Sequence, residues 1–255
     1  MNIIDTHTHL YLKQFNKDID LVINRSKEIG VKKFIFPAID SSHFDSMHSL
    51  KNKYPDNIYL MSGLHPTNVK ENYKNELDFV VDSLKTRDYV AIGEIGIDLY
   101  WDKSFLNEQQ EAFTFQIRLA IKHDLPIVIH CRDAFDEIFE ILDKENCDKL
   151  RGVFHCFTGT LEQAKRAIDL DFVLGIGGVV TFKNGGIDKF LNQIDLKHIV
   201  LETDSPYLAP VPFRGKRNES SYIIHVVEKL SEIYGLSNEE IADVTTKNAE
   251  KVFAL

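Results

Sequence analysis

Two histidines, His7 and His9, stand one residue apart directly after an apolar segment near the start of the chain. In an extended segment, residues two apart project from the same face, so both imidazoles can reach one metal ion. Such a pair is weak evidence on its own, because two histidines without a ligand explain it equally well. The pair gains weight only from residues elsewhere in the chain.

Four further residues of the same chemistry each stand at or just beyond the end of a short apolar segment: Glu94, His130, His155 and Asp204. The resulting set of imidazoles and carboxylates exceeds the three protein ligands of a typical catalytic metal site. It suits two cations that share a carboxylate and a water, roughly 3.5–4 Å apart. We therefore predict two divalent metal ions per subunit. Imidazole ligands favour Zn²⁺ or Mn²⁺, with Mg²⁺ as an alternative working ion.

The elements that must position these residues alternate along the chain, with short β-branched segments between longer amphipathic ones. Eight segments have the character of strands and cover Ile3–His7, Lys33–Ala38, Ile58–Gly63, Val90–Ile95, Ile127–His130, Gly152–His155, Phe172–Gly177 and Ile199–Glu202. Helical periodicity predicts helices over Glu108–His123 and Ala134–Lys144, and two more within Ser220–Leu255. The expected N-caps are Asp133, Thr160 and Ser237.

This alternation predicts an α/β fold with a parallel sheet, which is either closed as a barrel or open and doubly wound. The positions of the reactive residues decide between the two. In a closed barrel, the C-terminal ends of all strands converge on one mouth, where the active site lies. An open sheet would spread the same residues too widely for one site. We predict a single (β/α)8 TIM barrel domain over residues 1–255, with the metal site at the C-terminal ends of the strands.

The composition narrows the class of protein. The chain has 255 residues, of which 44% are hydrophobic and 27% charged, and its formal net charge is −9. No apolar run reaches the roughly 18 residues of a membrane span. The acidic balance weighs against a large nucleic-acid-binding surface but allows a local basic pocket. Three cysteines without CxxC spacing indicate a reducing compartment, so we expect a cytoplasmic protein, and no obligate protein partner is inferred.

The chain resembles the TatD family of metal-dependent deoxyribonucleases, within the amidohydrolase-like barrels. The resemblance covers essentially the whole chain and rests on Asp5–Leu10, Gly63–Pro66, Gly93–Asp98, His130–Ala134, His155–Gly159, Leu201–Pro210, Arg214–Asn218 and Thr245–Phe253. One departure is Glu219-Ser220-Ser221, where the family often has Glu-Pro-Ser. It removes a rigid turn but no functional group.

The resemblance also implies how the ligands divide. The first metal would be held by His7, His9 and Asp204, with Glu94 as the bridge, and the second by His130 and His155. Two cations would lower the pKa of the water between them and supply hydroxide as the nucleophile. Asp204 and Glu94 are the expected catalytic residues, with Asp204 orienting the water or accepting its proton. Glu202 shares a strand face with Asp204, and it either supports a metal ligand from behind or is a buried structural carboxylate.

Five residues are candidate substrate contacts: His65, Arg132, Arg214, Lys216 and Arg217. The last three lie in the segment that follows Asp204, and guanidinium groups suit bidentate phosphate contacts. A few phosphate contacts within an acidic molecule suit single-stranded DNA or chain ends better than long duplexes. The family resemblance therefore predicts a deoxyribonuclease, which we expect to be exonucleolytic.

A second reaction class stays open. The same metal centre could hydrolyse a carboxylic ester or amide, as in a D-aminoacyl-tRNA deacylase. The basic segment favours a phosphate-bearing substrate, but it does not separate DNA from an acylated tRNA.

Overall fold

The computed structural model describes residues 1–86 and 88–255. Within these residues, eight strands form one parallel sheet, in which each strand pairs with its neighbours in chain order. The strands are β1 Ile3–Asp5, β2 Val31–Phe36, β3 Ile58–Ser62, β4 Ala91–Asp98, β5 Ile127–Arg132, β6 Gly152–Phe154, β7 Phe172–Ile176 and β8 Ile199–Leu201. The N–H of Thr6 donates to the carbonyl of Leu201 at 3.0 Å and joins the last strand to the first. The predicted (β/α)8 barrel is confirmed.

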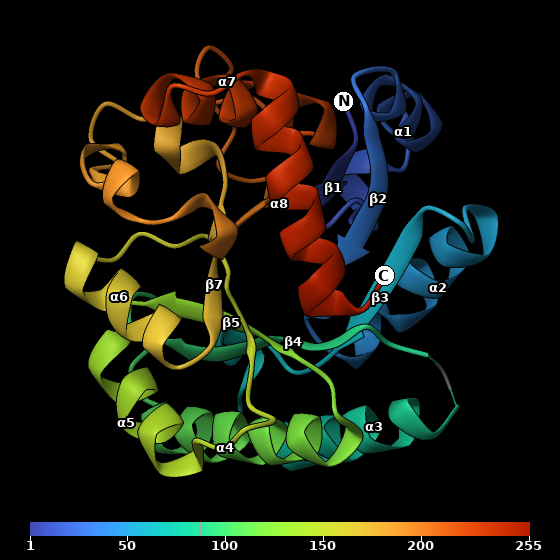
Figure 1. Ribbon diagram of the computed structural model, residues 1–255. Helices are drawn as coiled ribbons and strands as arrows, with labels where there is room; N and C mark the ends of the chain where they lie inside the picture. The colour runs from blue at the N-terminus through green and yellow to red at the C-terminus, as the bar shows by residue number, and fades with distance from the viewer. Residues whose placement is uncertain (87) are drawn as a thin grey trace.

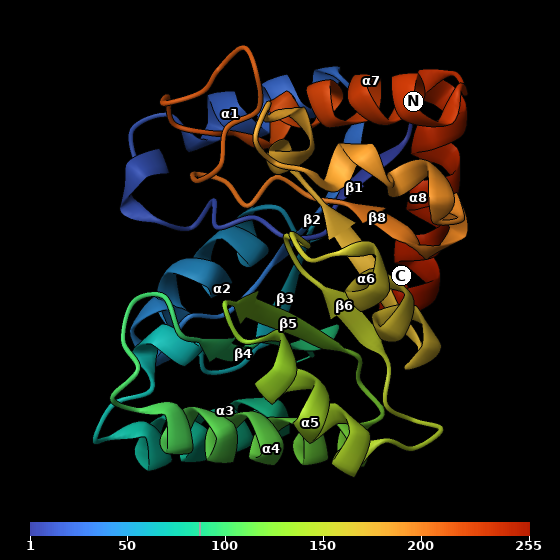
Figure 2. The ribbon, with the colours of Figure 1, turned by 90° about the vertical axis from the view of Figure 1, so that its left-hand side faces the viewer.

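Helices surround the sheet. They are α1 Ile19–Glu28, α2 Phe44–Lys53, α3 Tyr73–Thr86, α4 Leu106–His123, α5 Phe135–Glu145, α6 Leu161–Asp169, α7 Ile223–Tyr234 and α8 Asn238–Phe253. In Figures 1 and 2, α3, α4 and α5 line one side of the strands, and α7 lies on the opposite side. Among the described residues, no helix is long and apolar enough to cross a bilayer.

Short 3₁₀ helices occupy several of the connections between strands and helices. The connection from β7 to β8 contains four of them in place of an α-helix: η4 Gly178–Thr181, η5 Ile187–Lys189, η6 Leu191–Gln193 and η7 Leu196–His198. The others are η1 Lys13–Phe15, η2 Ser41–His43, η3 Pro66–Asn68 and η8 Ser220–Tyr222. The seventh strand–helix unit of the barrel therefore lacks a regular helix.

Alternation along the strands separates the barrel interior from its helix-facing surface. One buried cluster takes apolar side chains from most of the strands, and it packs against Ala249 and Phe253 of α8: Ile4, Ile35, Met61, Ala91, Val128, Val153 and Val200. A second, larger cluster contains their strand neighbours, such as Ile3, Phe34 and Ile129, together with the helices. The apolar layer fills the barrel next to α8, so polar groups collect nearer the C-terminal ends of the strands.

The predicted element boundaries are largely right, and the differences have physical causes. β1, β6 and β8 end one or two residues before the expected ends, because His7, His155 and Glu202 lie beyond the ladder. Thr160 and Ser237 are confirmed as N-caps, each within a capping box. The assignment of Asp133 as an N-cap was wrong: Ala134 precedes α5 without a side-chain cap, and Asp133 has a left-handed φ of 55°.

A β-bulge in β4 directs the central carboxylate. Gly93 pairs with Val128 and Ile95 pairs with Ile129, so Glu94 is the inserted residue between two consecutive partners on β5. An inserted residue breaks the alternation of faces and can redirect a side chain. Glu94 therefore projects into the barrel, although a regular pairing would place it on the same face as Ile129.

We expect Gly152→Ala to destabilise the barrel. A Cβ at Gly152 would lie 1.9 Å from the Ile127 carbonyl oxygen on β5, so the two strands would have to separate. Overpacking of this kind costs about 1–3 kcal/mol or more, and urea unfolding would measure it. Gly177→Ala is the matched control, because its nearest neighbour lies at 3.3 Å. Equal stability of the two variants would contradict the expectation.

Candidate metal centre

The carboxylate of Glu94 lies at the centre of the site, and its two oxygens face different imidazoles. Oε2 lies 3.1 Å from Nε2 of His7 and 3.8 Å from Nε2 of His9. Oε1 lies 2.7 Å from Nδ1 of His130 and 3.2 Å from Nε2 of His155. The carboxylate thus separates the histidines into two pairs, in the division that the family resemblance implies.

Asp204 completes the side of His7 and His9. Its Oδ1 lies 3.4 Å from Nε2 of His9 and 3.9 Å from Nε2 of His7. Its N–H donates to the His7 carbonyl at 2.9 Å, and its φ of 55° is left-handed. That conformation is uncommon for a residue with a side chain, and it is found at functional sites.

The strand register explains why these side chains meet. His130, His155 and Glu202 each follow an interior valine by two residues on β5, β6 and β8, and residues two apart share a face. All three therefore point into the barrel just above the apolar layer. The six predicted metal ligands come together at one place: His7, His9, Glu94, His130, His155 and Asp204.

Hydrogen bonds behind two histidines leave a ligand atom facing the centre. The Tyr11 hydroxyl donates to the Pro37 carbonyl, so at 2.8 Å it accepts from Nδ1 of His9. Glu202 accepts from Nδ1 of His155 at 3.1 Å and from the N–H of Cys156 at 2.7 Å. In each neutral ring the proton is on Nδ1, and the lone pair of Nε2 is free to bind a cation.

His130 is held from the other side. Its Nε2 lies 2.8 Å from Oδ2 of Asp98, and its Nδ1 faces Glu94. Burial would lower the pKa of His130, but hydrogen bonds to Asp98 and Glu94 outweigh burial and raise the pKa above its usual value. A cation between Nδ1 and Glu94 would take the place of the proton held there.

His65 has the opposite tautomer. Its Nδ1 accepts the N–H of Thr67 at 3.1 Å, so the neutral ring carries its proton on Nε2, which lies 3.3 Å from Oε1 of Glu94. Burial lowers the pKa of His65 and keeps the ring neutral. His65 therefore presents an N–H donor to the centre and no ligand lone pair, which fits its predicted role as a substrate contact better than metal binding.

His7 provides the test of whether a metal fits. The residue is fully buried, and within the described residues neither ring nitrogen makes a hydrogen bond of good geometry, although Nε2 lies 3.1 Å from the Glu94 carboxylate. A buried polar atom without a partner is costly, and a cation bound at Nε2 would remove the cost. Burial would raise the pKa of Glu94, but the imidazoles of His155, His65 and His7 hold it well below its usual value. An anionic carboxylate amid ligand nitrogens suits a divalent cation.

Comparisons with known proteins agree with this geometry. Residues 4–254 match the family described as TatD related DNase. The chain belongs to the TatD family. It is 38% identical to the uncharacterized metal-dependent hydrolase YabD of Bacillus subtilis over 254 residues, which is 99% of each chain. It is 33% identical to the uncharacterized metal-dependent hydrolase YcfH of Escherichia coli K12 over 257 residues, 99% of this chain and 96% of that one.

A solved TatD structure superposes closely. The crystal structure of YJJV, a TatD homologue from Escherichia coli K12, has a TM-score of 0.93 and 30% identity, and covers 99% of this chain and 98% of its own. The family match, the relatives and the cluster of ligand atoms together make this TatD protein a metal-dependent hydrolase.

The predicted basic contacts lie in different environments. Arg132 packs over the ring of Tyr100 at 3.8 Å, and Arg214 packs over Phe182 at 3.5 Å. Lys216 lies 5.6 Å from the Phe213 ring. Arg217 instead forms a two-pronged ion pair with Asp18, at 2.7 and 2.8 Å. The structure thus holds Arg217 in place as part of the fold, and its contact with substrate stays a prediction.

Sequence reasoning gave no role to Asp98 or Tyr11, which support His130 and His9. Asp98 also accepts the N–H groups of Tyr100 and Trp101, both at 3.0 Å, so it links the candidate ligand His130 to the aromatic residues under Arg132. A signal was available for Asp98, because it lies four residues after Glu94 in the same strand. Tyr11 offered none, since its partner is set by the path of the loop.

We expect Glu202→Ala to weaken metal binding, because it leaves Nδ1 of His155 and the N–H of Cys156 without their acceptor. Loss of such a supporting contact costs about 10- to 100-fold in metal affinity, measurable by titration with a fluorescent zinc indicator. Glu202→Gln keeps an acceptor oxygen and should lose less. Unchanged affinity in a folded Glu202→Ala variant would contradict this role.

For Arg217→Ala we expect lower stability with little change in KM. The Arg217 hydrogen bond lowers the pKa of Asp18, and this partly exposed pair contributes up to about 1 kcal/mol. A double-mutant cycle with Asp18→Ala, followed by chemical unfolding, measures the coupling. A large rise in KM at unchanged stability would instead place Arg217 on the substrate.

Proposed function

We propose that this TatD protein is a deoxyribonuclease that hydrolyses phosphodiester bonds, with single-stranded DNA or chain ends as its substrate and exonucleolytic cleavage as its mode. The observation that carries the proposal is a guanidinium next to the ligand set. Arg132 follows the ligand His130 by two residues and lines the same cavity. Guanidinium groups recognise phosphate oxygens by paired N–H donors.

The protein's own residues have separable roles in this reaction. Glu94, with a ligand nitrogen pair on each oxygen, would hold two divalent cations, for which Zn²⁺ and Mn²⁺ suit the imidazoles better than Mg²⁺. Such cations, when bound, polarise the phosphoryl group and lower the pKa of water. Asp204 orients the attacking water and accepts its proton. The Nε2–H of His65 donates to a phosphoryl oxygen as negative charge develops there.

The choice of DNA over another ester depends on the surroundings of the centre. His65 and Tyr207 line the small cavity of about 150 Å³ that contains the ligand set, together with His9, Glu94 and Asp204. A cavity of this size admits a phosphodiester group, but the rest of a nucleotide must lie outside it. The net charge of −9 disfavours extended duplex binding and favours a short single strand.

Parallel assays test the proposal. Single-stranded DNA, duplex DNA and D-aminoacyl-tRNA are offered to metal-free protein and to protein loaded with Zn²⁺, Mn²⁺ or Mg²⁺. We expect metal-dependent release of mononucleotides from single-stranded DNA, slower action on duplex, and no release of amino acid. Glu94→Ala and Asp204→Ala should abolish cleavage by removing the shared carboxylate and the proton acceptor, with folding checked by circular dichroism.

Two results would overturn parts of the proposal. Cleavage of DNA that survives in both variants would exclude this site. Rapid deacylation of D-aminoacyl-tRNA without cleavage of DNA would make the protein an esterase acting at the same metal centre.

A further inference from the structure

Three neighbouring cavities form a continuous groove that leaves the metal centre in one direction. The ligand cavity shares His130 and His155 with a larger pocket of about 800 Å³. That pocket shares Thr158, Val179 and Gly185 with an outer cavity of about 530 Å³, which Arg214 also lines. The groove crosses the loops that follow β5, β6 and β7.

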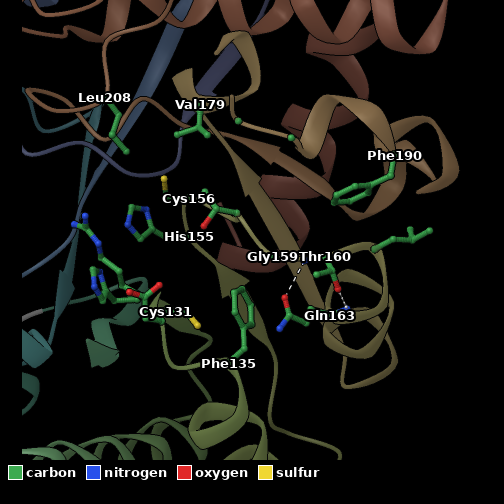
Figure 3. Close-up of a pocket in the computed structure, with 17 residues that line it drawn as sticks. Cys131, Phe135, His155, Cys156, Gly159, Thr160, Gln163, Val179, Phe190 and Leu208 are labelled. Atoms are coloured by element: carbon green, nitrogen blue, oxygen red, sulfur yellow. Dashed lines mark hydrogen bonds between the residues drawn. The ribbon is translucent and has the colours of Figure 1, made fainter. Parts of the chain in front are cut away.

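The larger pocket has apolar walls beside the reactive centre. Figure 3 shows His155 on the side of the centre, with Phe135, Val179 and Leu208 lining the space next to it. The Gln163 side chain, which could read a base, is engaged in the capping box with Thr160. Phe135, Val179 and Leu208 would accept a base by its face, and such stacking distinguishes bases poorly.

Charge distinguishes this groove from the rest of the surface. The larger pocket and the outer cavity together contain Arg132, Lys183 and Arg214 but only one carboxylate, Asp133. By contrast, the groove of about 750 Å³ between α4 and α5 contains three glutamates against one arginine and one lysine. On a molecule of net charge −9, the groove beside the centre is a local positive channel.

The described arginines fall into two groups, those with a carboxylate partner and those without one. Five of the arginines that the structure describes have a carboxylate partner within 4.0 Å: Arg25, Arg118, Arg151, Arg166 and Arg217. Over residues 1–86 and 88–255, Arg132 and Arg214 form no such pair. Each instead rests on an aromatic ring, which fixes the guanidinium plane and leaves its N–H donors for an anion.

We propose that this groove holds the substrate strand, with Arg132 as the phosphate contact next to the scissile bond and Arg214 as the contact further along the chain. This proposal rests on the proposed function and adds the path that the substrate strand takes across the protein. The base next to the cleaved bond lies in the apolar pocket between the two arginines. The strand leaves over the loops after β6 and β7, and the ion-paired Arg217 does not line these cavities.

Chain length tests the two contacts. We compare KM and kcat for a thymidine dinucleotide, which has one phosphodiester, and for a hexathymidylate, using the metal-loaded enzyme. Arg132→Ala should raise KM about 10- to 100-fold on both substrates, as expected for a lost charged hydrogen bond. Arg214→Ala should raise KM about tenfold more on the hexamer than on the dinucleotide. Arg166→Ala, an ion-paired arginine outside the groove, is the control.

Salt dependence gives a second readout by fluorescence anisotropy, with a fluorescein-labelled phosphorothioate hexathymidylate. Two phosphate contacts predict a slope of log affinity against log salt of about −1.4, and each arginine variant should reduce it by about half.

The outcomes separate the inference from the function. If wild type cleaves both substrates but Arg214→Ala behaves alike on both, or if the slope is several times steeper than expected, the groove does not carry the strand. If wild type cleaves neither substrate, the proposed function fails and takes the groove proposal with it. A length-dependent KM with kcat retained supports the path.

Discussion

The carboxylate of Glu94 is the group on which the rest of the site depends. A charged carboxylate so deeply buried would be unstable alone, since desolvation of an ion costs several kcal/mol. Imidazoles at or just beyond the ends of β1, β5 and β6 face its two oxygens, and a cation bound between these nitrogens and the carboxylate would balance its charge. The carboxylate in turn gives those imidazoles an anionic neighbour. The requirement for cations follows from the same arrangement, because neutral ligand nitrogens around one anion attract positive charge.

Hydrogen bonds from behind the site give four of its histidines distinct roles: His9, His65, His130 and His155. Tyr11, Glu202 and Asp98 hold one nitrogen of a ligand ring, so the other faces the centre. Thr67 does the reverse for His65 and turns its proton inward. Similar side chains within one cavity thus become ligands or a donor according to the partner behind them. The hydrogen-bond partner of the outer ring nitrogen thus sets the tautomer of each ring. The tautomer in turn decides whether the inner nitrogen offers a lone pair or a proton.

The role of each surface arginine also depends on its partner. Most of the arginines that the structure describes are paired with a carboxylate, as Arg118 of α4 is with Glu145 of α5. Within residues 1–86 and 88–255, Arg132 and Arg214 have no carboxylate partner, and both line the groove beside the candidate metal centre. Under the proposed function, this acidic protein would attract a polyanion at that one groove, where its unpaired cations collect.

The sequence by itself determined the barrel and which candidate ligands meet in it. Reactive residues at the ends of apolar strands can converge only in a closed sheet, and the spacing of His7 and His9 places them on one face. Local pattern also located the caps at Thr160 and Ser237, because a capping box depends on neighbours in the chain. It failed for Asp133, whose left-handed backbone is set by the turn after β5.

Only the tertiary structure decided which way Glu94 points and which nitrogens are free. The bulge in β4 depends on pairing with β5, and that register is not a property of either segment alone. The partners of Arg217 and His9, Asp18 and Tyr11, are likewise fixed by how loops from separate strands meet. Residue type and spacing therefore determined which groups take part, and contacts between distant segments decided what each one does.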